Sequence, residues 1–284
     1  MTEMSQHKGI LMDGSALAHQ MIENDKKEIK DNKYNPRLAA IIVGTDKGCY
    51  TYQQMKERKC AEVGIRYSLY AYTNPPEPSV IKEMITKLNK DEDITGVMVQ
   101  LPLPANYNEN EILELVATEK DVDGLNSVNI GRSYYNTDVF VPCAAEGIIR
   151  MLKAYELDVK SKKAVVLGRG SLLGTPVAQL LERENAFVTK IHSIVNEDDV
   201  IRELSTADVV ISATGKAGLI DADMLKEGAI IFDCANTKSE REFKDSVFDK
   251  ASYYSTVPGG IGPMTISVLI NNVVKAYKHS IEVL

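Results

Sequence analysis

The sequence predicts an α/β protein with two lobes built on parallel sheets. Apolar segments of five or six residues alternate along the chain with stretches of helical periodicity. The apolar segments are continuous rather than alternating with polar residues, which is typical of strands covered on both faces of a parallel sheet. A length of 284 residues allows one large domain or two modest ones. These observations favour repeated strand–helix units.

The expected elements follow in chain order. Gly64 should end the second helix, and an amphipathic helix over 143–157 followed by a polar segment should connect the lobes. The last helix should return to the first lobe, so we expect lobes of residues 1–143 plus 265–284 and of residues 144–264. The predicted strands are 38–43, 96–100, 164–168, 187–191, 208–213 and 229–233. The predicted helices are 16–29, 52–63, 80–88, 143–157, 177–184, 199–204 and 265–279.

Composition excludes several classes of protein. The chain has 33 basic and 40 acidic residues, a formal charge of −7, which disfavours binding to nucleic acid or an anionic membrane. No apolar run is long enough for a signal sequence or a membrane span. The four cysteines stand apart without a C-x-x-C motif, so we expect neither a metal site nor disulfides, and a cytoplasmic location.

The segment VVLGRGSLLGTP at 165–176 predicts a nucleotide-binding turn. Gly168 and Gly170 follow a strand and precede a helix, where a backbone turn can approach a pyrophosphate. The spacing is G-x-G-x-x-x-G, so an ordinary tight turn is the alternative.

The cofactor preference is read from the next strand. No carboxylate follows residues 187–191, where NAD-selective sites usually place one. Arg169, Ser171 and His192 could receive a 2′-phosphate, which favours NADP. Arg169 as an ordinary surface charge is the alternative.

A second group of candidates lies at 49–60. Cys49, Tyr52 and Lys56 share one face if a single helix contains all three. That face would meet the carboxyl edge of the sheet, where ligands bind. The alternative is an amphipathic helix with an exposed Lys56.

Two further segments complete the candidates. Gln100 ends a buried strand before a Pro pair, and Asp121 and Asp123 flank a turn at Gly124, where a plain turn aspartate is the alternative for Asp123. The loop VPGGIGPMTI at 257–266 brings backbone N–H groups within reach of a flat or anionic ligand. A purely structural loop is the alternative there, and Pro263 suits the first turn of the following helix.

The order and spacing of six motifs closely resemble the bifunctional methylenetetrahydrofolate dehydrogenase/methenyltetrahydrofolate cyclohydrolase family. The motifs are VGTDKGCYTYQQMK, QLPLP, KDVDGLN, GRGSLLGTP, SATGKAG and PGGIGPMTI, and they span nearly the whole chain. The resemblance implies a folate-binding catalytic lobe and a Rossmann-like NAD(P)-binding lobe, with the active-site cleft between them. It implies oxidation of 5,10-methylenetetrahydrofolate by NADP⁺ and hydrolysis of the methenyl product to 10-formyltetrahydrofolate.

The resemblance also implies roles for individual residues. Lys56 would transfer protons during hydrolysis, poised by Gln100, while Tyr52 stacks on the folate and Asp123 hydrogen-bonds the pterin. Further folate contacts would come from Cys49, Leu101, Pro102, Pro258, Gly259 and Gly260. Cofactor contacts would come from Gly168, Arg169, Gly170, Ser171, Gly174, His192, Ser193, Ala213, Thr214, Gly215 and Asn236. The family implies a cytoplasmic homodimer in one-carbon metabolism and purine biosynthesis, using NADP, with NAD as the alternative, and no metal.

The chain departs from the family pattern at several positions, most of them around the cofactor. Cys49 and Gly170 stand where Ser is usual, and Ala144 and Ala145 replace Thr and Pro. The segments ending in Val195 and reading DCANTK at 233–238 also differ. Two alternatives therefore stay open: a cyclohydrolase whose dehydrogenase is weakened or prefers NAD, and a non-catalytic folate or nucleotide sensor.

Overall fold

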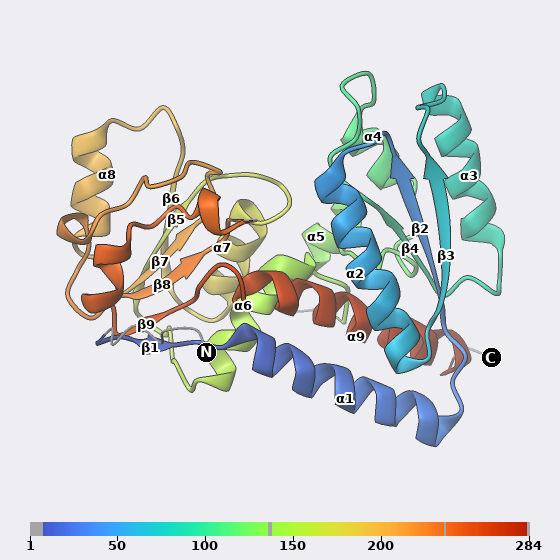
Figure 1. Ribbon diagram of the computed structural model, residues 1–284, viewed down its shortest axis with the longest axis horizontal. Helices are drawn as coiled ribbons and strands as arrows, with labels where there is room; N and C mark the ends of the chain where they lie inside the picture. Colours follow the sequence, from blue (N-terminus) through green and yellow to red (C-terminus); the bar gives the residue numbers. More distant parts are fainter. Residues whose placement is uncertain (1–7, 136–137, 236, 283–284) are drawn as a thin grey trace. The chain divides into compact units, whose positions relative to one another are not determined.

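The computed structural model describes residues 8–135, 138–235 and 237–282, which form two compact units (Figure 1). The three-stranded lobe consists of His19–Cys143 and residues 266–282. The six-stranded lobe consists of residues 8–18 and Ala144–Thr265. No helix in these described ranges is long and apolar enough to cross a membrane.

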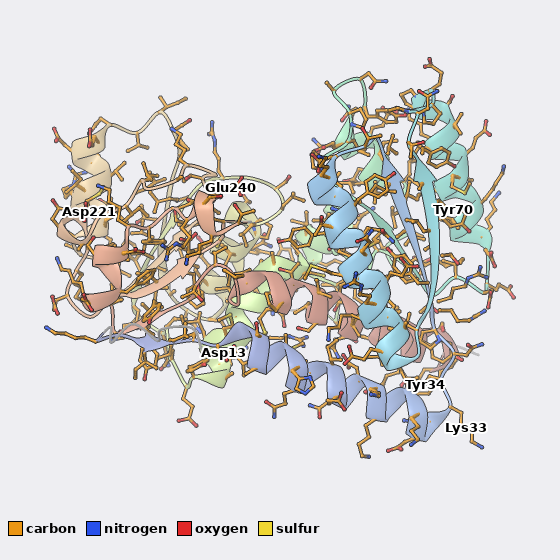
Figure 2. All side chains as sticks on the ribbon, in the orientation of Figure 1. Asp13, Lys33, Tyr34, Tyr70, Asp221 and Glu240 are labelled. Carbon is orange, nitrogen blue, oxygen red and sulfur yellow. The ribbon has the colours of Figure 1, made fainter. Side chains whose placement is uncertain are left out.

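The three-stranded lobe is built on a parallel sheet in the order β3-β2-β4. Tyr34, which follows α1 and is labelled in Figure 2, packs its ring 5.2 Å from that of Tyr277 on α9. The strands are β2 (Arg37–Val43), β3 (Arg66–Tyr72) and β4 (Gly96–Val99). The helices are α1 (Gly14–Asn32), α2 (Lys47–Val63), α3 (Pro78–Lys90), α4 (Glu109–Glu114), α5 (Ser127–Tyr134) and α9 (Ile261–Glu282), of which α1 and α9 begin within the residues of the six-stranded lobe.

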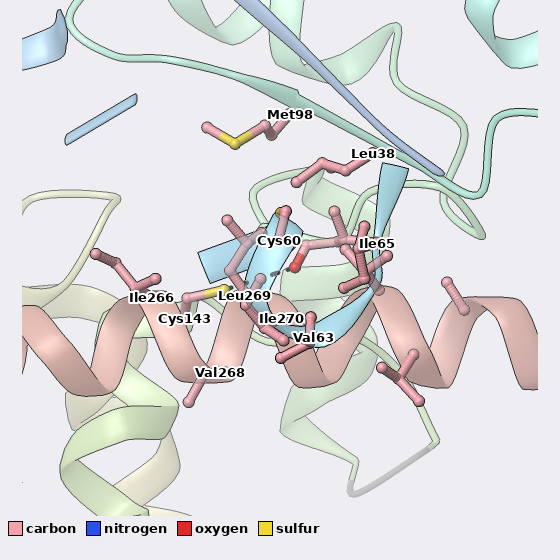
Figure 3. Close-up of a cluster of buried hydrophobic side chains, with 14 of the residues drawn as sticks. Leu38, Cys60, Val63, Ile65, Met98, Cys143, Ile266, Val268, Leu269 and Ile270 are labelled. Carbon is pink, nitrogen blue, oxygen red and sulfur yellow. Dashed lines mark hydrogen bonds between the residues drawn. The ribbon is translucent and has the colours of Figure 1, made fainter. Parts of the chain in front are cut away.

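Both faces of this sheet are buried, as continuous apolar strands predict. Leu38 and Ala40 of β2 belong to a core cluster with residues of α1, α2 and α9, part of which Figure 3 draws. The intervening Ala39 and Ile41 belong to a second cluster with α3 and α4. Successive β2 side chains therefore anchor helices on opposite faces.

The six-stranded lobe is also entirely parallel, in the order β1-β9-β8-β7-β5-β6. Its first strand after the connecting helix, β5, has β6 on one side and β7 on the other, so the strand order reverses at β5. Ligands of open α/β sheets bind at the carboxyl ends of strands at such a point. The strands are β1 (Ile10–Leu11), β5 (Lys163–Leu167), β6 (Phe187–Ile191), β7 (Val209–Ser212), β8 (Ile230–Asp233) and β9 (Tyr253–Tyr254), and the helices are α6 (Cys143–Ala154), α7 (Gly174–Arg183) and α8 (Glu197–Leu204).

The α/β class with parallel sheets is confirmed, and every predicted strand and helix has a counterpart in the structure. The sequence did not predict β3, whose segment RYSLYAY is only half-buried and interrupts its apolar residues with polar ones. It also missed α4 and α5, which are short, and β1 and β9, which have two residues each. The pairing of β1 with β9 groups residues 8–18 with the six-stranded lobe, whereas the predicted boundary assigned them to the other lobe.

Replacing Gly64 by Ala should destabilise the three-stranded lobe. Gly64 ends α2 with φ +92°, and its N–H donates to the Cys60 carbonyl at 3.0 Å. Because Ala adopts this left-handed conformation at a cost, we expect the free energy of unfolding, measured in urea, to fall by about 1 kcal/mol. Gly131→Ala is the matched control, since it lies inside α5 with open space around it and should be neutral or stabilising. Equal effects of the two variants would contradict the capping argument.

Candidate active site

The helix α2 carries the first group of candidate residues. Its N-terminus is capped by Asp46, whose carboxylate accepts the Cys49 N–H at 2.8 Å. The helix therefore contains Cys49, Tyr52 and Lys56 in one continuous segment, as their predicted common face requires. Lys56 is only 7% exposed, so the alternative of a solvated lysine is wrong. Tyr52 is half-buried and packs against the core cluster below the helix.

Among the described residues, the Lys56 ammonium donates a hydrogen bond to the side chain of Gln100. Lys56 Nζ donates to Gln100 Oε1 at 2.9 Å, and Gln100 Nε2 donates to the Leu101 carbonyl at 2.9 Å. The Gln100 N–H extends the sheet by donating to Ile41 at 2.8 Å, which fixes the residue at the carboxyl end of β4. Burial lowers the pKa of Lys56, and the nearby Asp123 carboxylate opposes this.

Asp121 and Asp123, the two aspartates before Gly124, differ in their contacts. Asp121 is buried and accepts the backbone N–H groups of Leu125 at 3.1 Å and Asn126 at 2.8 Å, so it holds the turn. Burial raises the pKa of Asp121 to about 6. Asp123 is half-buried, and its charge acts on Lys56. The turn is thus tied by Asp121, which leaves Asp123 beside the lysine.

Two thiols border the lysine. Cys49 Sγ donates to the Leu101 carbonyl at 3.4 Å, and burial raises the pKa of this thiol to about 11. Burial and the Asp123 carboxylate raise the pKa of Cys143 well above its usual value. Asn272 of α9 donates to Cys143 Sγ at 3.6 Å. Both cysteines are therefore neutral at pH 7 and leave Lys56 without a thiolate partner.

In the six-stranded lobe, the Gly-rich segment follows β5 as predicted. Gly168 has φ +103°, and a Cβ there would lie 2.3 Å from the Ala213 carbonyl oxygen. A Cβ on Gly174, where α7 begins, would lie 2.4 Å from the Gly168 oxygen. Both glycines are required by close backbone approach. Gly170 is different, because a Cβ would meet nothing within 4 Å, so no close approach among the described residues requires glycine there.

The candidates for a phosphate site lie after neighbouring strands. The Gly168 N–H donates to Ile191 at 2.8 Å, which sets the end of β5 beside the end of β6. Arg169, Ser171 and Ser193 are exposed, and His192 is half-buried with Nδ1 accepting the Ile194 N–H at 3.4 Å. Asn236 lies outside the described residues.

The Gly/Pro loop at 257–266 leads into α9. The Gly259 carbonyl accepts the Ser15 N–H at 2.9 Å, and a Cβ on Gly14 would lie 2.1 Å from the Gly260 oxygen. The loop therefore packs against the first turn of α1. Leu101–Pro102 and Val257–Pro258 are cis peptide bonds.

Sequence reasoning missed one carboxylate that shapes the site. Glu242 is buried and accepts the backbone N–H groups of Thr214 and Gly215, two predicted cofactor residues. It lies in SEREFKD, a mostly charged segment in which Phe243 is also buried and no periodicity sets Glu242 apart. Its contacts, with residues 27 to 30 positions earlier, arise only in the folded chain.

Comparisons with known proteins agree with this geometry. The family model of the tetrahydrofolate dehydrogenase/cyclohydrolase catalytic domain matches residues 12–123, and that of its NAD(P)-binding domain matches residues 142–281. A relative from Campylobacter hominis, a bifunctional protein FolD, is 37% identical over 96% of this chain and 98% of its own. A relative of the same name from Staphylococcus aureus is 37% identical over 94% of this chain and 96% of its own.

Solved structures give the same result. The bifunctional FolD enzyme from Campylobacter jejuni has a TM-score of 0.91 and 34% identity, covering 95% of this chain and 98% of its own. The Trypanosoma brucei dehydrogenase-cyclohydrolase, solved with NADP and an inhibitor, has a TM-score of 0.91 and 30% identity, covering 96% and 98%. With both domain models and these relatives matched along nearly its whole length, the chain belongs to the tetrahydrofolate dehydrogenase/cyclohydrolase family.

Proposed function

We propose that this protein oxidises 5,10-methylenetetrahydrofolate with NADP⁺ and hydrolyses the 5,10-methenyl product to 10-formyltetrahydrofolate. The observation that carries the proposal is the buried Lys56–Gln100 pair at the carboxyl end of β4, in a chain matched by both domains of the family. A sensor without catalytic activity has no evident use for a buried, oriented lysine of lowered pKa.

Lys56 is proposed to carry the hydrolysis. Water adds to the bridging carbon of the methenyl cation, one proton leaves that water, and one proton reaches the departing nitrogen. A lysine whose pKa is lowered by burial exchanges protons more readily near neutral pH than an exposed one. Gln100 holds the ammonium in place because its own amide is fixed by Leu101.

The remaining folate contacts are proposed around this lysine. Tyr52, one helical turn before Lys56, would stack on the aromatic ring, and Asp123 would accept hydrogen bonds from the pterin. Asp123 suits this role because Asp121, not Asp123, accepts the backbone N–H groups that hold the turn. Cys49, Leu101 and Pro102 would contact the folate beside these residues.

The six-stranded lobe is proposed to bind the nucleotide, which accepts a hydride when bound. The start of α7 is proposed for the pyrophosphate, because the Gly174 N–H donates to no described residue and the space beside Gly170 is open. The Thr175 N–H donates to the Gly170 carbonyl at 3.0 Å, and Pro176 has no N–H. Hydride loss needs positioning rather than an acid or base, so the chain's contribution to this step is orientation.

The finer assignments are proposals as well. NADP is favoured over NAD because residues 192–195 carry no carboxylate and Arg169 is exposed just after the carboxyl end of β5. Four free cysteines suit a reducing cytoplasm. A homodimer and a place in purine biosynthesis follow from the family resemblance.

The direct test supplies methylenetetrahydrofolate with NADP⁺ or NAD⁺ and follows absorbance of the methenyl product and of the reduced nucleotide. We expect product with NADP⁺ and a higher Michaelis constant for NAD⁺. Separately supplied methenyltetrahydrofolate should disappear faster than in buffer alone. Absence of nucleotide reduction with either cofactor would refute the dehydrogenase, and hydrolysis at the buffer rate would refute the cyclohydrolase.

A further inference from the structure

The turn that follows β7 is tied to one buried carboxylate, that of Glu242. The Thr214 N–H donates to both carboxylate oxygens at 2.9 Å, and the Gly215 N–H donates to Oε1 at 2.7 Å. The Thr214 hydroxyl donates to Oε2 at 2.7 Å, and the Ser212 hydroxyl donates to the same oxygen. Glu242 is 1% exposed. Four donor groups at the end of one strand therefore converge on a single side chain.

Glu242 is itself fixed by its backbone. Its N–H donates to Asp233 Oδ2 at 3.1 Å, and Asp233 is the last residue of β8. Its carbonyl accepts the Ile220 N–H at 3.0 Å, beyond the far side of the turn. The Glu242 backbone is thus held beside the end of β8, and its side chain reaches the end of β7.

The direction of these bonds decides what the turn can offer a ligand. The N–H groups of Thr214 and Gly215 point at Glu242, so they are not available to a phosphate. Within the described residues, no group donates to the carbonyl oxygens of Thr214 or Gly215. A Cβ on Gly215 would meet nothing within 4 Å, so the outer side of the turn is open. The turn therefore presents acceptors to a ligand rather than donors.

We propose that Glu242 is a positioning residue for the nicotinamide nucleotide, orienting the turn after β7 so that its carbonyl oxygens accept hydrogen bonds from the ligand's ribose hydroxyls or carboxamide. This rests on the proposed function, because it takes the ligand of the six-stranded lobe to be that nucleotide. Phosphate binding is left to the start of α7, where the Gly174 N–H donates to no group among the described residues.

Glu242→Leu keeps the approximate size of the side chain but removes every acceptor. The N–H groups of Thr214 and Gly215 then lose their partner, and the turn should rotate to recover hydrogen bonds. We expect the Michaelis constant for NADP⁺ to rise about tenfold or more, since 1.4 kcal/mol corresponds to a factor of ten. Glu242→Gln should stay within about threefold of the parent, because its amide oxygen can accept both N–H groups while the two hydroxyls turn to accept from its nitrogen.

The matched control is Glu240→Leu. Glu240 is exposed on the short helical turn Lys238–Glu240, two residues before Glu242, and is labelled in Figure 2. Circular dichroism and urea unfolding show whether these three variants are folded. If Glu242→Leu does not fold, Glu242→Asp provides the test, because it keeps the charge but withdraws it by one methylene and should also raise the Michaelis constant.

The outcomes separate the two proposals. An unmodified protein that reduces neither nucleotide refutes the proposed function. An active parent, together with a folded Glu242→Leu or Glu242→Asp variant whose Michaelis constant for NADP⁺ is unchanged, refutes the positioning role. A Glu242→Gln variant as impaired as Glu242→Leu would also refute it, because the glutamine amide oxygen can accept hydrogen bonds from both N–H groups.

Discussion

Replacing Lys56 by Met should slow hydrolysis of methenyltetrahydrofolate by about 10²- to 10⁴-fold, the usual contribution of a positioned acid or base. Methionine retains most of the length and the apolar stem but carries no proton. Oxidation of methylenetetrahydrofolate should continue, because that step needs no proton transfer. The methenyl product should therefore accumulate, and its absorbance should rise to a plateau instead of decaying.

Lys59→Met is the control for this experiment. Lys59 lies on the same helix, but its ammonium is partly exposed and pairs with Glu62 at 2.7 Å. We expect its hydrolysis rate to equal that of the parent. A Lys56→Met variant that hydrolyses methenyltetrahydrofolate at the parent rate would remove Lys56 from the mechanism.

Stability provides a second reading of the Lys56 environment. Burial lowers the pKa of Lys56 in the folded protein, so the unfolded chain binds this proton more tightly. The lysine therefore costs stability below its folded pKa, and this cost disappears as the pH rises toward 10.5, the ordinary value. Lys56→Met should thus be at least as stable as the parent at pH 7. Its advantage in urea unfolding should shrink as the pH rises toward 10.5, and a difference that stays constant over this range would contradict the burial argument.

The sequence predicted most of the fold because the strands and helices that build the cores are apolar along their length. Leu38 to Val43 and Val209 to Ser212 are buried throughout, and their nearly continuous apolar residues predict this burial. The edge strand Arg66–Tyr72 could not be predicted this way, since pairing with β2 and the packing of its tyrosines against the two core clusters hold its mixed sequence in place.

The site was predictable to a different extent in the two lobes. Cys49, Tyr52 and Lys56 lie on one helix, so spacing alone placed them together, although nothing in the residues indicated that Lys56 is buried. Glu242 could not be found, because its partners come from β7 and the loop after it. The functions of individual residues depended on the family resemblance rather than on periodicity.

Replacing Gly168 by Ala should abolish most nucleotide-dependent oxidation while leaving hydrolysis in the three-stranded lobe. The left-handed φ of +103° costs a residue with a side chain roughly 1–3 kcal/mol. The new Cβ would also lie 2.3 Å from the Ala213 carbonyl oxygen, which is backbone. Ala213 cannot give way freely, because its N–H donates to Leu167 at 2.8 Å, beyond the last paired residues of β5 and β7.

The same displacement links this prediction to the turn held by Glu242. Ala213 leads directly into Thr214, so moving it would strain the hydrogen bonds that Thr214 makes with Glu242. We expect lower stability in urea, followed by circular dichroism, and a loss of NADP⁺ reduction larger than any loss of hydrolysis. Gly170→Ala separates packing from ligand binding, because its Cβ would meet no described residue within 4 Å beyond its chain neighbours. Its stability should therefore match that of the parent. If Gly170→Ala nevertheless raises the Michaelis constant for NADP⁺, the new methyl group obstructs the nucleotide and not the protein. Equal destabilisation by Gly170→Ala and Gly168→Ala would contradict the close backbone approach at Gly168.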